Sequence, residues 1–396
     1  MNQEAEVALV VKLKPGQDKR IMGGHLWVFS NEIAQAPKAK AGDVVQVVAS
    51  NGRPVGTALY HPNSLIACRM LAFEAVEVDQ AFFYKRLAAA IAYREKVRPG
   101  ETSYRLCFGE SDGLPGLVVD RYGSVLVLQV LSAGMEARLP MIQGALEELL
   151  KPQGIYLKND HRARTLEGLP AETRTLCGSV PEYVQVSEGG LRFKTPLTEG
   201  QKTGFYFDQA ENRAFLRPYF KDRAVLDLYC YTGAFAINAA KFGAKAVLAV
   251  DSSGPAIALA KENAELNGVE VAFEEDDAED ALRSFSEGKQ PLKPDMILLD
   301  PPSLVPAKKH LPRALKQYAK LNTWALRALP KGGLLVSSTC TQHVTREIFV
   351  QMLKIAQAAA QKPTRLLALR GQGADHPILL AMPETEYLQF ALLEVL

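Results

Sequence analysis

Residues 224–251 read AVLDLYCYTGAFAINAAKFGAKAVLAVD, which is an apolar run, a short loop with one glycine, a helix-like stretch and a second apolar run. This arrangement is typical of two buried parallel strands joined by a helix. The alternation continues through PAIALAKENAELNG, DMILLDPP, LPRALKQYAKLNTWALRAL and GGLLVSSTC. We therefore predict a parallel sheet covered by helices on both faces, with ligands bound at the carboxyl ends of its strands.

Two further segments precede this region, as expected because a chain of 396 residues is too long for one ordinary core. Residues 1–75 hold short alternating runs broken by turn signals such as Pro15-Gly16 and Asn51-Gly52, typical of a small β-barrel or sandwich. Residues 76–190 mix helical and strand-like stretches and predict a central α/β domain. Residues 191–396 form the third predicted domain, and the overall fold class is α/β.

Composition limits the function only weakly. The 46 basic and 44 acidic side chains leave a net charge of +2, which neither supports nor excludes a nucleic-acid partner. No apolar run reaches the roughly 18 residues of a membrane-spanning helix, and the N-terminus lacks the features of a secretory signal, so we expect a cytoplasmic protein. The five cysteines are widely spaced and form no C-x-x-C pair, which argues against disulfides and structural zinc. No metal site is predicted.

Acidic residues follow successive predicted strands, where a ligand would bind. Asp227 ends the first strand, and the loop through Thr232 and Gly233 lets a ligand approach the backbone closely. The loop has one glycine and is not G-x-G-x-x-G, so a dinucleotide is disfavoured. Asp251, at the end of the next strand, is placed to accept hydrogen bonds from ribose hydroxyls. Asp277, after the third strand, could accept from the amino group of an adenine.

Each of these aspartates could instead be a helix cap or a solvated turn residue. As an ordered series on one sheet without a phosphate loop, however, they suit a neutral or cationic nucleoside. S-adenosylmethionine fits that description better than NAD or ATP. We therefore predict S-adenosylmethionine as the cofactor.

The fourth strand ends in the rigid sequence Asp300-Pro301-Pro302, whose carbonyls remain free to meet a base. Cys340 follows the next strand and should reach the same rim of the sheet. Carbon 5 of a pyrimidine is too weak a nucleophile to take a methyl group directly, so an enzyme first adds a thiolate at carbon 6. Cys340 is placed for that addition, although Asp-Pro-Pro loops also serve amine methylation, which needs no thiol, and a strand-ending cysteine can be structural.

Several blocks together resemble one known family. GQKTGFYFDQAENR (200–213), DLYCYTGAFA, LAVDSSGPAI, DPPS and SSTC, behind GHLWVFSNEI, look like the RlmI-like ribosomal large-subunit RNA cytosine-5 methyltransferases, which are class I S-adenosylmethionine-dependent enzymes. The resemblance covers nearly the whole chain. It implies an N-terminal PUA domain that binds RNA, a central α/β domain, a C-terminal Rossmann-like methyltransferase domain and a possible homodimer.

The resemblance also implies roles for individual residues. The cofactor would be held by a set of ten positions, namely Tyr206, Asp208, Gln209, Asp227, Thr232, Gly233, Asp251, Asp277, Asp300 and Pro301. Asp300 would also face the base, and Cys340 would be the nucleophile. This sequence departs from the family pattern in two places, because Ser303 follows Asp-Pro-Pro and Thr341, not serine, follows Cys340. The Asp-Pro-Pro loop has no second cysteine, and the group that removes the carbon-5 proton is not identified.

Basic and aromatic residues give a second reason to expect RNA. They are Lys14, Lys19, Arg20, Trp27, Arg162 and Arg164, which could hold phosphates and stack bases. Charge runs are usually only solvated faces, so this signal depends on the resemblance. The target base must be unpaired or flipped to reach the pocket.

Three hypotheses stay open on the sequence alone. The first is a methyltransferase that forms 5-methylcytosine in large-subunit ribosomal RNA, either naked or in an assembly intermediate. The second is methylation of a purine nitrogen in ribosomal RNA by a sister family, for which Cys340 would be dispensable. The third is a non-catalytic RNA-binding factor of ribosome assembly.

Overall fold

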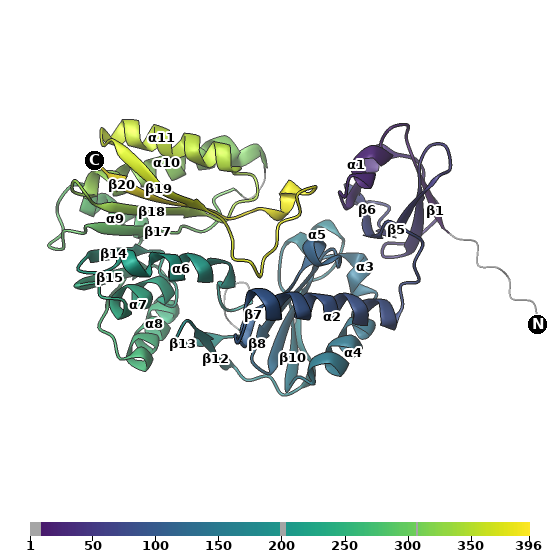
Figure 1. Cartoon of the computed structure of the whole chain (residues 1–396), viewed down its shortest axis with the longest axis horizontal. Coiled ribbons are helices and arrows are strands. Elements are labelled where there is room, and N and C mark those ends of the chain that lie inside the picture. Colours follow the sequence, from purple (N-terminus) through teal and green to yellow (C-terminus); the bar gives the residue numbers. More distant parts are fainter. Residues whose placement is uncertain (1–8, 199–202, 306–307) are drawn as a thin grey trace, which may run out of the picture. The chain divides into compact units, whose positions relative to one another are not determined.

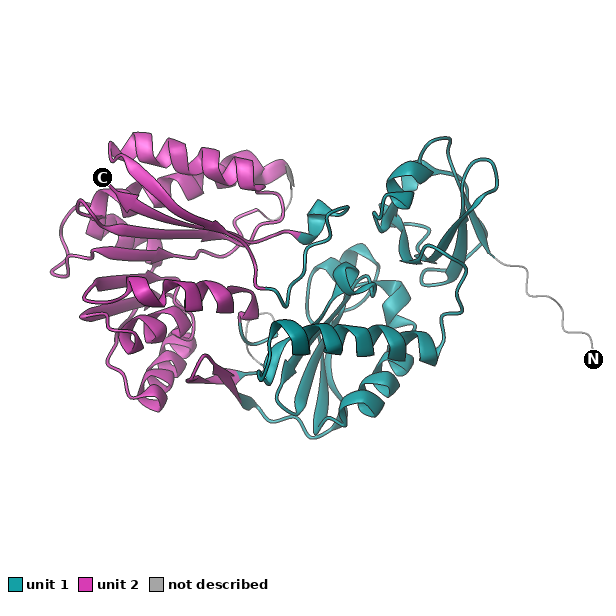
Figure 2. Ribbon diagram, viewed as in Figure 1, with its two compact units in different colours: residues 1–184, 196–205, 374–385 teal, residues 185–195, 206–373, 386–396 magenta. Residues whose placement is uncertain are grey.

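The computed structural model describes residues 9–198, 203–305 and 308–396 (Figure 1). Residues 200–202 of the block GQKTGFYFDQ therefore lie outside the described part. The contacts group the chain into two compact units (Figure 2). Unit 1 contains residues 1–184, 196–205 and 374–385, and unit 2 contains residues 185–195, 206–373 and 386–396. Residues 1–184 fall in one unit, so the division at residues 75 and 190 stays a prediction.

Unit 1 begins with a six-stranded sheet in the order β2-β6-β5-β4-β1-β3. Its elements are β1 (Val10–Leu13), α1 (Asp18–Met22), β2 (Trp27–Phe29), η1 (Ser30–Glu32), β3 (Ile33–Gln35), β4 (Val44–Val48), β5 (Pro54–Tyr60) and β6 (Ile66–Ala72). β1 and β4 pair in parallel and the other neighbours are antiparallel. Alternate residues such as Val11, Val45 and Val47 point into one apolar core, which is the period-two pattern read from the sequence.

The second part of unit 1 is a five-stranded sheet in the order β11-β10-β9-β8-β7. The elements are α2 (Gln80–Val97), β7 (Ser103–Phe108), η2 (Gly109–Asp112), β8 (Leu117–Tyr122), β9 (Val125–Val130), α3 (Ala133–Glu136), α4 (Leu139–Leu150), β10 (Gly154–Asn159), α5 (Ala163–Leu166) and β11 (Glu172–Gly178). Asp79 caps α2 by accepting a hydrogen bond from the backbone N–H of Phe82. The predicted central α/β segment is thus a sheet with helices.

A late segment of the chain, residues 374–385, also belongs to unit 1. Its backbone carbonyls accept hydrogen bonds there, from the hydroxyl of Tyr93 to Ala374 at 2.9 Å and from the guanidinium of Arg94 to Asp375 at 2.8 Å. The Asp375 carboxylate accepts from the backbone N–H of Arg105 at 3.1 Å. These buried bonds fix the segment to β7 and α2.

Unit 2 contains a seven-stranded sheet in the order β16-β15-β14-β17-β18-β20-β19. Its strands are β14 (Ala224–Leu228), β15 (Ala246–Asp251), β16 (Ala272–Glu275), β17 (Met296–Leu299), β18 (Leu334–Thr339), β19 (Thr364–Arg370) and β20 (Gln389–Val395). β14 to β18 are parallel, and β20 is antiparallel to both neighbours. A separate hairpin is formed by β12 (Tyr183–Glu188) and β13 (Leu191–Pro196).

Helices cover both faces of this sheet, as predicted. They are α6 (Ala210–Leu216), α7 (Ala234–Lys241), α8 (Gly254–Asn267), α9 (Ala278–Ser286), α10 (Leu311–Ala328) and α11 (Arg346–Ala360). Figure 1 shows α10 and α11 on one face and α7 and α8 on the other. Leu226 packs in the core with α9, α10 and α11, whereas its neighbour Val225 packs in the core with α7. Buried apolar side chains cover both faces of the sheet, which explains the continuous apolar runs in the sequence of its strands.

The order of the strands brings distant loops together. The order in which successive strands are added to the sheet switches between β14 and β17. These two strands are neighbours, and Leu228 of β14 pairs with Leu299 of β17. β17 and β18 are also adjacent, with Leu299 opposite Ser337. The residues that follow these three strands therefore emerge at one edge, at the position where such sheets bind ligands.

None of the helices in the described ranges is both long and apolar enough to span a membrane.

Candidate active site

The loop after β14 has an unusual backbone. Tyr229, Tyr231 and Gly233 all have positive φ, at 64°, 49° and 83°, and such residues cluster at ligand-binding sites. A Cβ atom on Gly233 would lie 3.2 Å from the Cβ of Ala260 and 3.3 Å from the ring of Phe273. Glycine is therefore required here both by the backbone angle and by the space.

Asp251 holds this loop in place. One carboxylate oxygen accepts from the backbone N–H of Tyr231 at 2.8 Å, and the other accepts from the N–H of Ser253 at 3.0 Å. Ser253 in turn caps α8 by accepting from Ala256. Asp251 thus orders two loops at the rim, and its contact with ribose stays a prediction.

Asp227 is a buried acid with an unfilled acceptor. Its side chain lies at the end of β14 with the residue 1% exposed, and its Oδ2 has no hydrogen-bond partner among the described residues. Burial and then the nearby carboxylate of Asp300 raise its pKa well above the usual value for aspartate, while a backbone hydrogen bond from Ala236 opposes the shift. A cationic ligand would supply the missing partner and favour the ionised form.

Asp277 is an exposed helix cap. Its Oδ1 accepts from the backbone N–H groups of Glu279 and Asp280, at 2.9 and 3.0 Å. Burial and then the charge of Asp277 raise the pKa of Tyr229, so the Asp277 carboxylate lies near the loop after β14. The capping alternative therefore describes what Asp277 does in this structure, and its contact with adenine stays a prediction.

Asp300 is fixed by two donors. The hydroxyl of Ser338 donates to Oδ1 at 2.5 Å, and the side-chain amide of Gln209 donates to Oδ2 at 3.1 Å. Gln209 is itself oriented, because its carbonyl oxygen accepts from Asn212 at 2.8 Å. Pro301, which follows, is buried. The Asp300 carboxylate is therefore presented in one orientation at the rim.

The block after residue 203 brings further predicted residues to the same place. The hydroxyl of Tyr387 donates to Asp208 at 2.6 Å, and the ring of Tyr206 meets that of Tyr231 edge to face at 5.6 Å. Burial first, and then the charges of Asp208, Tyr231, Cys340 and Asp300, raise the pKa of Tyr206. The Tyr206 hydroxyl thus shares its surroundings with the proposed base-binding and nucleophilic groups.

A buried ion pair anchors this block. Arg213 donates two hydrogen bonds to Glu188, at 2.7 and 2.6 Å, and a third to the carbonyl of Tyr206 at 2.9 Å. Both charged side chains are less than 10% exposed. The pair ties β12 to the start of α6 and fixes the backbone that carries Tyr206.

Cys340 follows β18 directly and is half-buried between the buried residues Thr339 and Thr341. At the other four cysteines burial raises the pKa, to about 12 for Cys68 and in the same direction for Cys107, Cys230 and Cys177. Burial therefore favours the protonated form of those four thiols.

The sequence reading missed Ser338 and the Arg213–Glu188 pair. A signal for Ser338 was present, because two serines interrupt the apolar run LLVSST of a strand that is buried along its whole length. A buried hydroxyl needs a partner, and an acid at the end of the neighbouring strand is an obvious candidate. The ion pair had no local signal, since its partners are 25 residues apart.

The predicted RNA contacts fall into two groups. Lys14 and Lys19 are exposed. Arg20 pairs with Glu32 at 2.7 Å, and the indole N–H of half-buried Trp27 donates to Glu110 at 2.9 Å. These last two side chains therefore already support the fold.

The two arginines near residue 163 also differ. Arg162 is exposed, whereas the side chain of Arg164 is 1% exposed and donates to the carbonyl of Pro170 at 2.9 Å and to Glu136 at 2.8 Å. Arg164 is used inside unit 1 and presents almost no surface to RNA. Arg162 is the better placed of the two.

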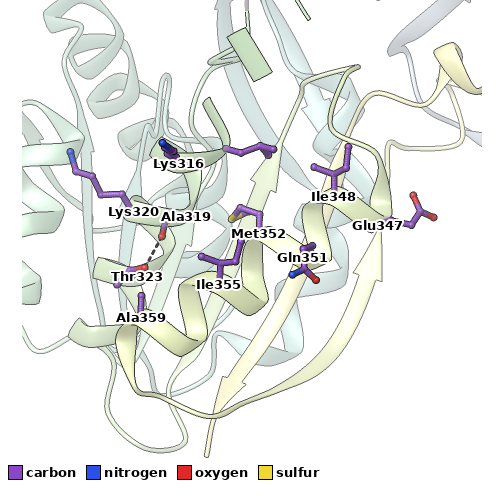
Figure 3. A pocket seen from close by; sticks show the side chains of 11 residues that line it. Lys316, Ala319, Lys320, Thr323, Glu347, Ile348, Gln351, Met352, Ile355 and Ala359 are labelled. Atoms are coloured by element: carbon purple, nitrogen blue, oxygen red, sulfur yellow. Dashed lines mark hydrogen bonds between the residues drawn. The ribbon is translucent and has the colours of Figure 1, made fainter. Parts of the chain in front are cut away.

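A groove of about 790 Å³ lies between α10 and α11 (Figure 3). Its floor is apolar and includes Ala319, Ile348, Met352 and Ile355. None of the predicted cofactor or catalytic residues lines it.

Comparison with known proteins agrees with this geometry. Residues 11–73 match the family model of a PUA-like domain, and residues 114–351 match that of an S-adenosylmethionine-dependent methyltransferase. Ribosomal RNA large subunit methyltransferase I of Alteromonas mediterranea is 36% identical over 392 residues, which cover 97% of this chain and 98% of that protein. The chain belongs to this methyltransferase family. The protein of the same name from Klebsiella pneumoniae is 35% identical over 95% of this chain and 96% of its own.

Solved structures share the fold of this family. A protein from Streptococcus mutans named as a SAM-dependent methyltransferase superposes with a TM-score of 0.85 at 22% identity, covering 98% of this chain and all of that one. A methyltransferase complexed with SAH gives the same TM-score at 23% identity, with the same coverage. The predicted PUA-like domain and class I methyltransferase fold are confirmed.

The cofactor of the family is S-adenosylmethionine, as predicted. The residues present fit it, because Asp227 offers a buried carboxylate oxygen without a partner to a ligand that carries an ammonium and a sulfonium charge. Gly233 leaves room for close approach to the backbone. No group of side chains in the described residues could hold a metal ion.

Proposed function

We propose that this protein forms 5-methylcytosine in large-subunit ribosomal RNA, with Cys340 as the nucleophile. The observation that supports the proposal is that Cys340 follows β18 while Asp300, whose carboxylate is fixed by Ser338, follows the adjacent parallel strand β17, so both residues emerge at the same edge of the sheet. The names of the relatives support ribosomal RNA as the substrate. Those names do not state which atom of the RNA is methylated, so we infer the modified atom from the chemistry of the site.

The chemistry follows from these two groups. The thiolate of Cys340 adds to carbon 6 of the base, which makes carbon 5 an enamine-like nucleophile. Bound S-adenosylmethionine supplies a methyl group activated by a sulfonium. Once carbon 5 has taken the methyl group from the sulfonium, which leaves as a neutral thioether, a general base would remove the carbon-5 proton. The thiolate is then expelled and the aromatic ring is restored.

Asp300 orients the base in this scheme. Its two oxygens accept from Ser338 and Gln209, and a carboxylate can accept more than two hydrogen bonds. A cytosine amino group is a suitable further donor.

RNA would be held by the PUA-like domain and by exposed basic side chains, of which Lys14, Lys19 and Arg162 are accessible. The target nucleotide must be unpaired or flipped out for Cys340 to reach it. A homodimer, which the family resemblance implies, stays a prediction that sedimentation velocity tests.

The decisive test compares Cys340→Ala with wild type and with Cys177→Ala, a control at another half-buried cysteine. Each protein is incubated with tritiated S-adenosylmethionine and large-subunit ribosomal RNA from a strain that lacks the gene, and the labelled nucleoside is identified. We expect 5-methylcytidine from wild type and Cys177→Ala and none from Cys340→Ala. A labelled purine formed equally well without Cys340 would support methylation of a purine nitrogen, and cofactor binding without any transfer would support an assembly factor.

A further inference from the structure

The loops that carry Asp300 and Cys340 are joined by a cluster of hydroxyl groups, formed by Ser303, Tyr318 and Thr341. The Ser303 and Thr341 hydroxyls are 3.0 Å apart, and the Tyr318 hydroxyl lies 3.1 Å from that of Thr341. The Tyr318 oxygen also accepts from the backbone N–H of Leu304 at 3.1 Å and lies 3.3 Å from the carbonyl of Pro302. One side chain from α10 thus contacts both loops.

This cluster is well placed to resist movement. Tyr318 is 1% and Thr341 is 2% exposed, although Ser303 is exposed. Hydrogen bonds shielded from water are stronger, and breaking them leaves buried polar groups without partners. Burial raises the pKa of Tyr318, and its hydrogen bond with Thr341 opposes the shift. The hydroxyl is therefore neutral and contacts the residue that follows Cys340.

We infer that Tyr318 is a positioning residue, whose hydroxyl sets the separation between the Asp-Pro-Pro loop and the thiol of Cys340. Asp300 already has fixed donors from Ser338 of β18 and from Gln209, the residue before α6, but the chain beyond each strand leaves the sheet ladder and needs another restraint. Thr341 is the residue next to Cys340, and Pro302 is two residues from Asp300. The catalytic consequence of this inference rests on the proposed function.

The cluster also contains both positions at which the sequence departs from the family pattern, Ser303 and Thr341. Ser303 and Thr341 are 38 residues apart in sequence and are bonded to each other. The two changes therefore form one local unit. This unit supplements the Tyr318 bond without replacing any catalytic group.

The test is Tyr318→Phe, which keeps the packed ring and removes only the hydroxyl. Tyr219→Phe is the matched control. Its ring packs in the same unit, against the apolar core that contains Val225 and helix α7, and beside Phe215. We expect kcat for RNA methylation to fall about tenfold in Tyr318→Phe, since small misplacements of reacting groups slow chemistry strongly. KM for RNA and the Kd for S-adenosylmethionine should stay within about twofold of wild type.

A second readout is independent of turnover. Alkylation of Cys340 by iodoacetamide, followed by mass spectrometry without RNA or cofactor, should be about fivefold faster in Tyr318→Phe because the released loop exposes the thiol. Thr341→Val, which removes a different hydroxyl of the cluster, should change both readouts in the same direction. Tyr219→Phe should change neither.

Three outcomes have separate meanings. A kcat within about twofold of wild type in both Tyr318→Phe and Thr341→Val would overturn the positioning role. That result together with an inactive Cys340→Ala enzyme would leave the proposed function intact. An active Cys340→Ala enzyme would instead overturn the covalent chemistry, and faster alkylation in Tyr318→Phe would still support the restraint on the loop.

Discussion

Substitution of Gly233 by alanine tests the geometry of the cofactor loop most directly. The residue has a φ of 83°, and an added Cβ would meet three neighbouring atoms at 3.2 to 3.3 Å. A left-handed conformation costs an alanine about 1–2 kcal/mol, and moving those neighbours adds to this cost. Because the loop lines the site, we expect Gly233→Ala to lose stability and also to weaken S-adenosylmethionine binding about tenfold, which corresponds to about 1.4 kcal/mol.

Gly268→Ala separates the two contributions. Gly268 also has a positive φ, at 61°, but nothing lies within 4 Å of an added Cβ. It should lose only the conformational part of the stability, which lowers the melting temperature by about 2–4 °C per kcal/mol. Its cofactor affinity should not change. Thermal unfolding and calorimetric titration with S-adenosylmethionine provide both measurements.

The result that would refute this reasoning is an equal effect of the two substitutions. If Gly233→Ala and Gly268→Ala lowered stability equally and both bound the cofactor as wild type does, the close contacts of Gly233 would have no role in binding.

Three further predictions concern the strand ends and the block beside them. The pKa of Asp227 is raised in the folded protein, so wild type without cofactor should lose stability as pH rises above the unfolded pKa of about 3.9. Asp227→Asn should flatten this pH dependence of the melting temperature and should weaken cofactor binding. An unchanged slope of melting temperature against pH would contradict the raised pKa. Ser338→Ala removes the hydrogen bond to Asp300 and should lower kcat about tenfold. Ser337→Ala, at a buried hydroxyl without a partner among the described residues, should leave kcat unchanged. Equal kcat values for the two variants would show that Ser338 does not orient Asp300. Arg213→Met should lower the free energy of unfolding by about 3–5 kcal/mol in denaturant titrations because Glu188 is left buried and unpaired, and Glu188→Gln on the Arg213→Met background should recover part of it.

The parallel sheet could be predicted because its strands carry their own signal. β14, β17 and β18 are buried along their whole length, so their sequences AVLDL, MILL and LLVSST are mainly apolar. The pairing of β20 between β18 and β19 had no such signal. It depends on contacts between residues 50 to 60 positions apart along the chain, such as Leu334 with Glu394.

The candidate site was predictable in its positions more than in its interactions. Strand ends placed Asp227, Asp251, Asp300 and Cys340 at one edge, and the structure has them there. The donors that orient Asp300 come from β18 and from Gln209, the residue before α6, and the hydroxyl cluster joins residues from three segments. Such partners are set by packing in three dimensions, which the spacing of residues along a chain does not encode.

The return of residues 374–385 to unit 1 limits how this protein can be divided. The chain passes between the units after residues 184, 195, 205, 373 and 385. A single cut therefore cannot release either unit whole, and a fragment containing only residues 191–396 would carry a segment whose partners, among them Tyr93 and Arg94, have been left behind. Exchanging either unit with that of a relative consequently requires splicing at several points at once.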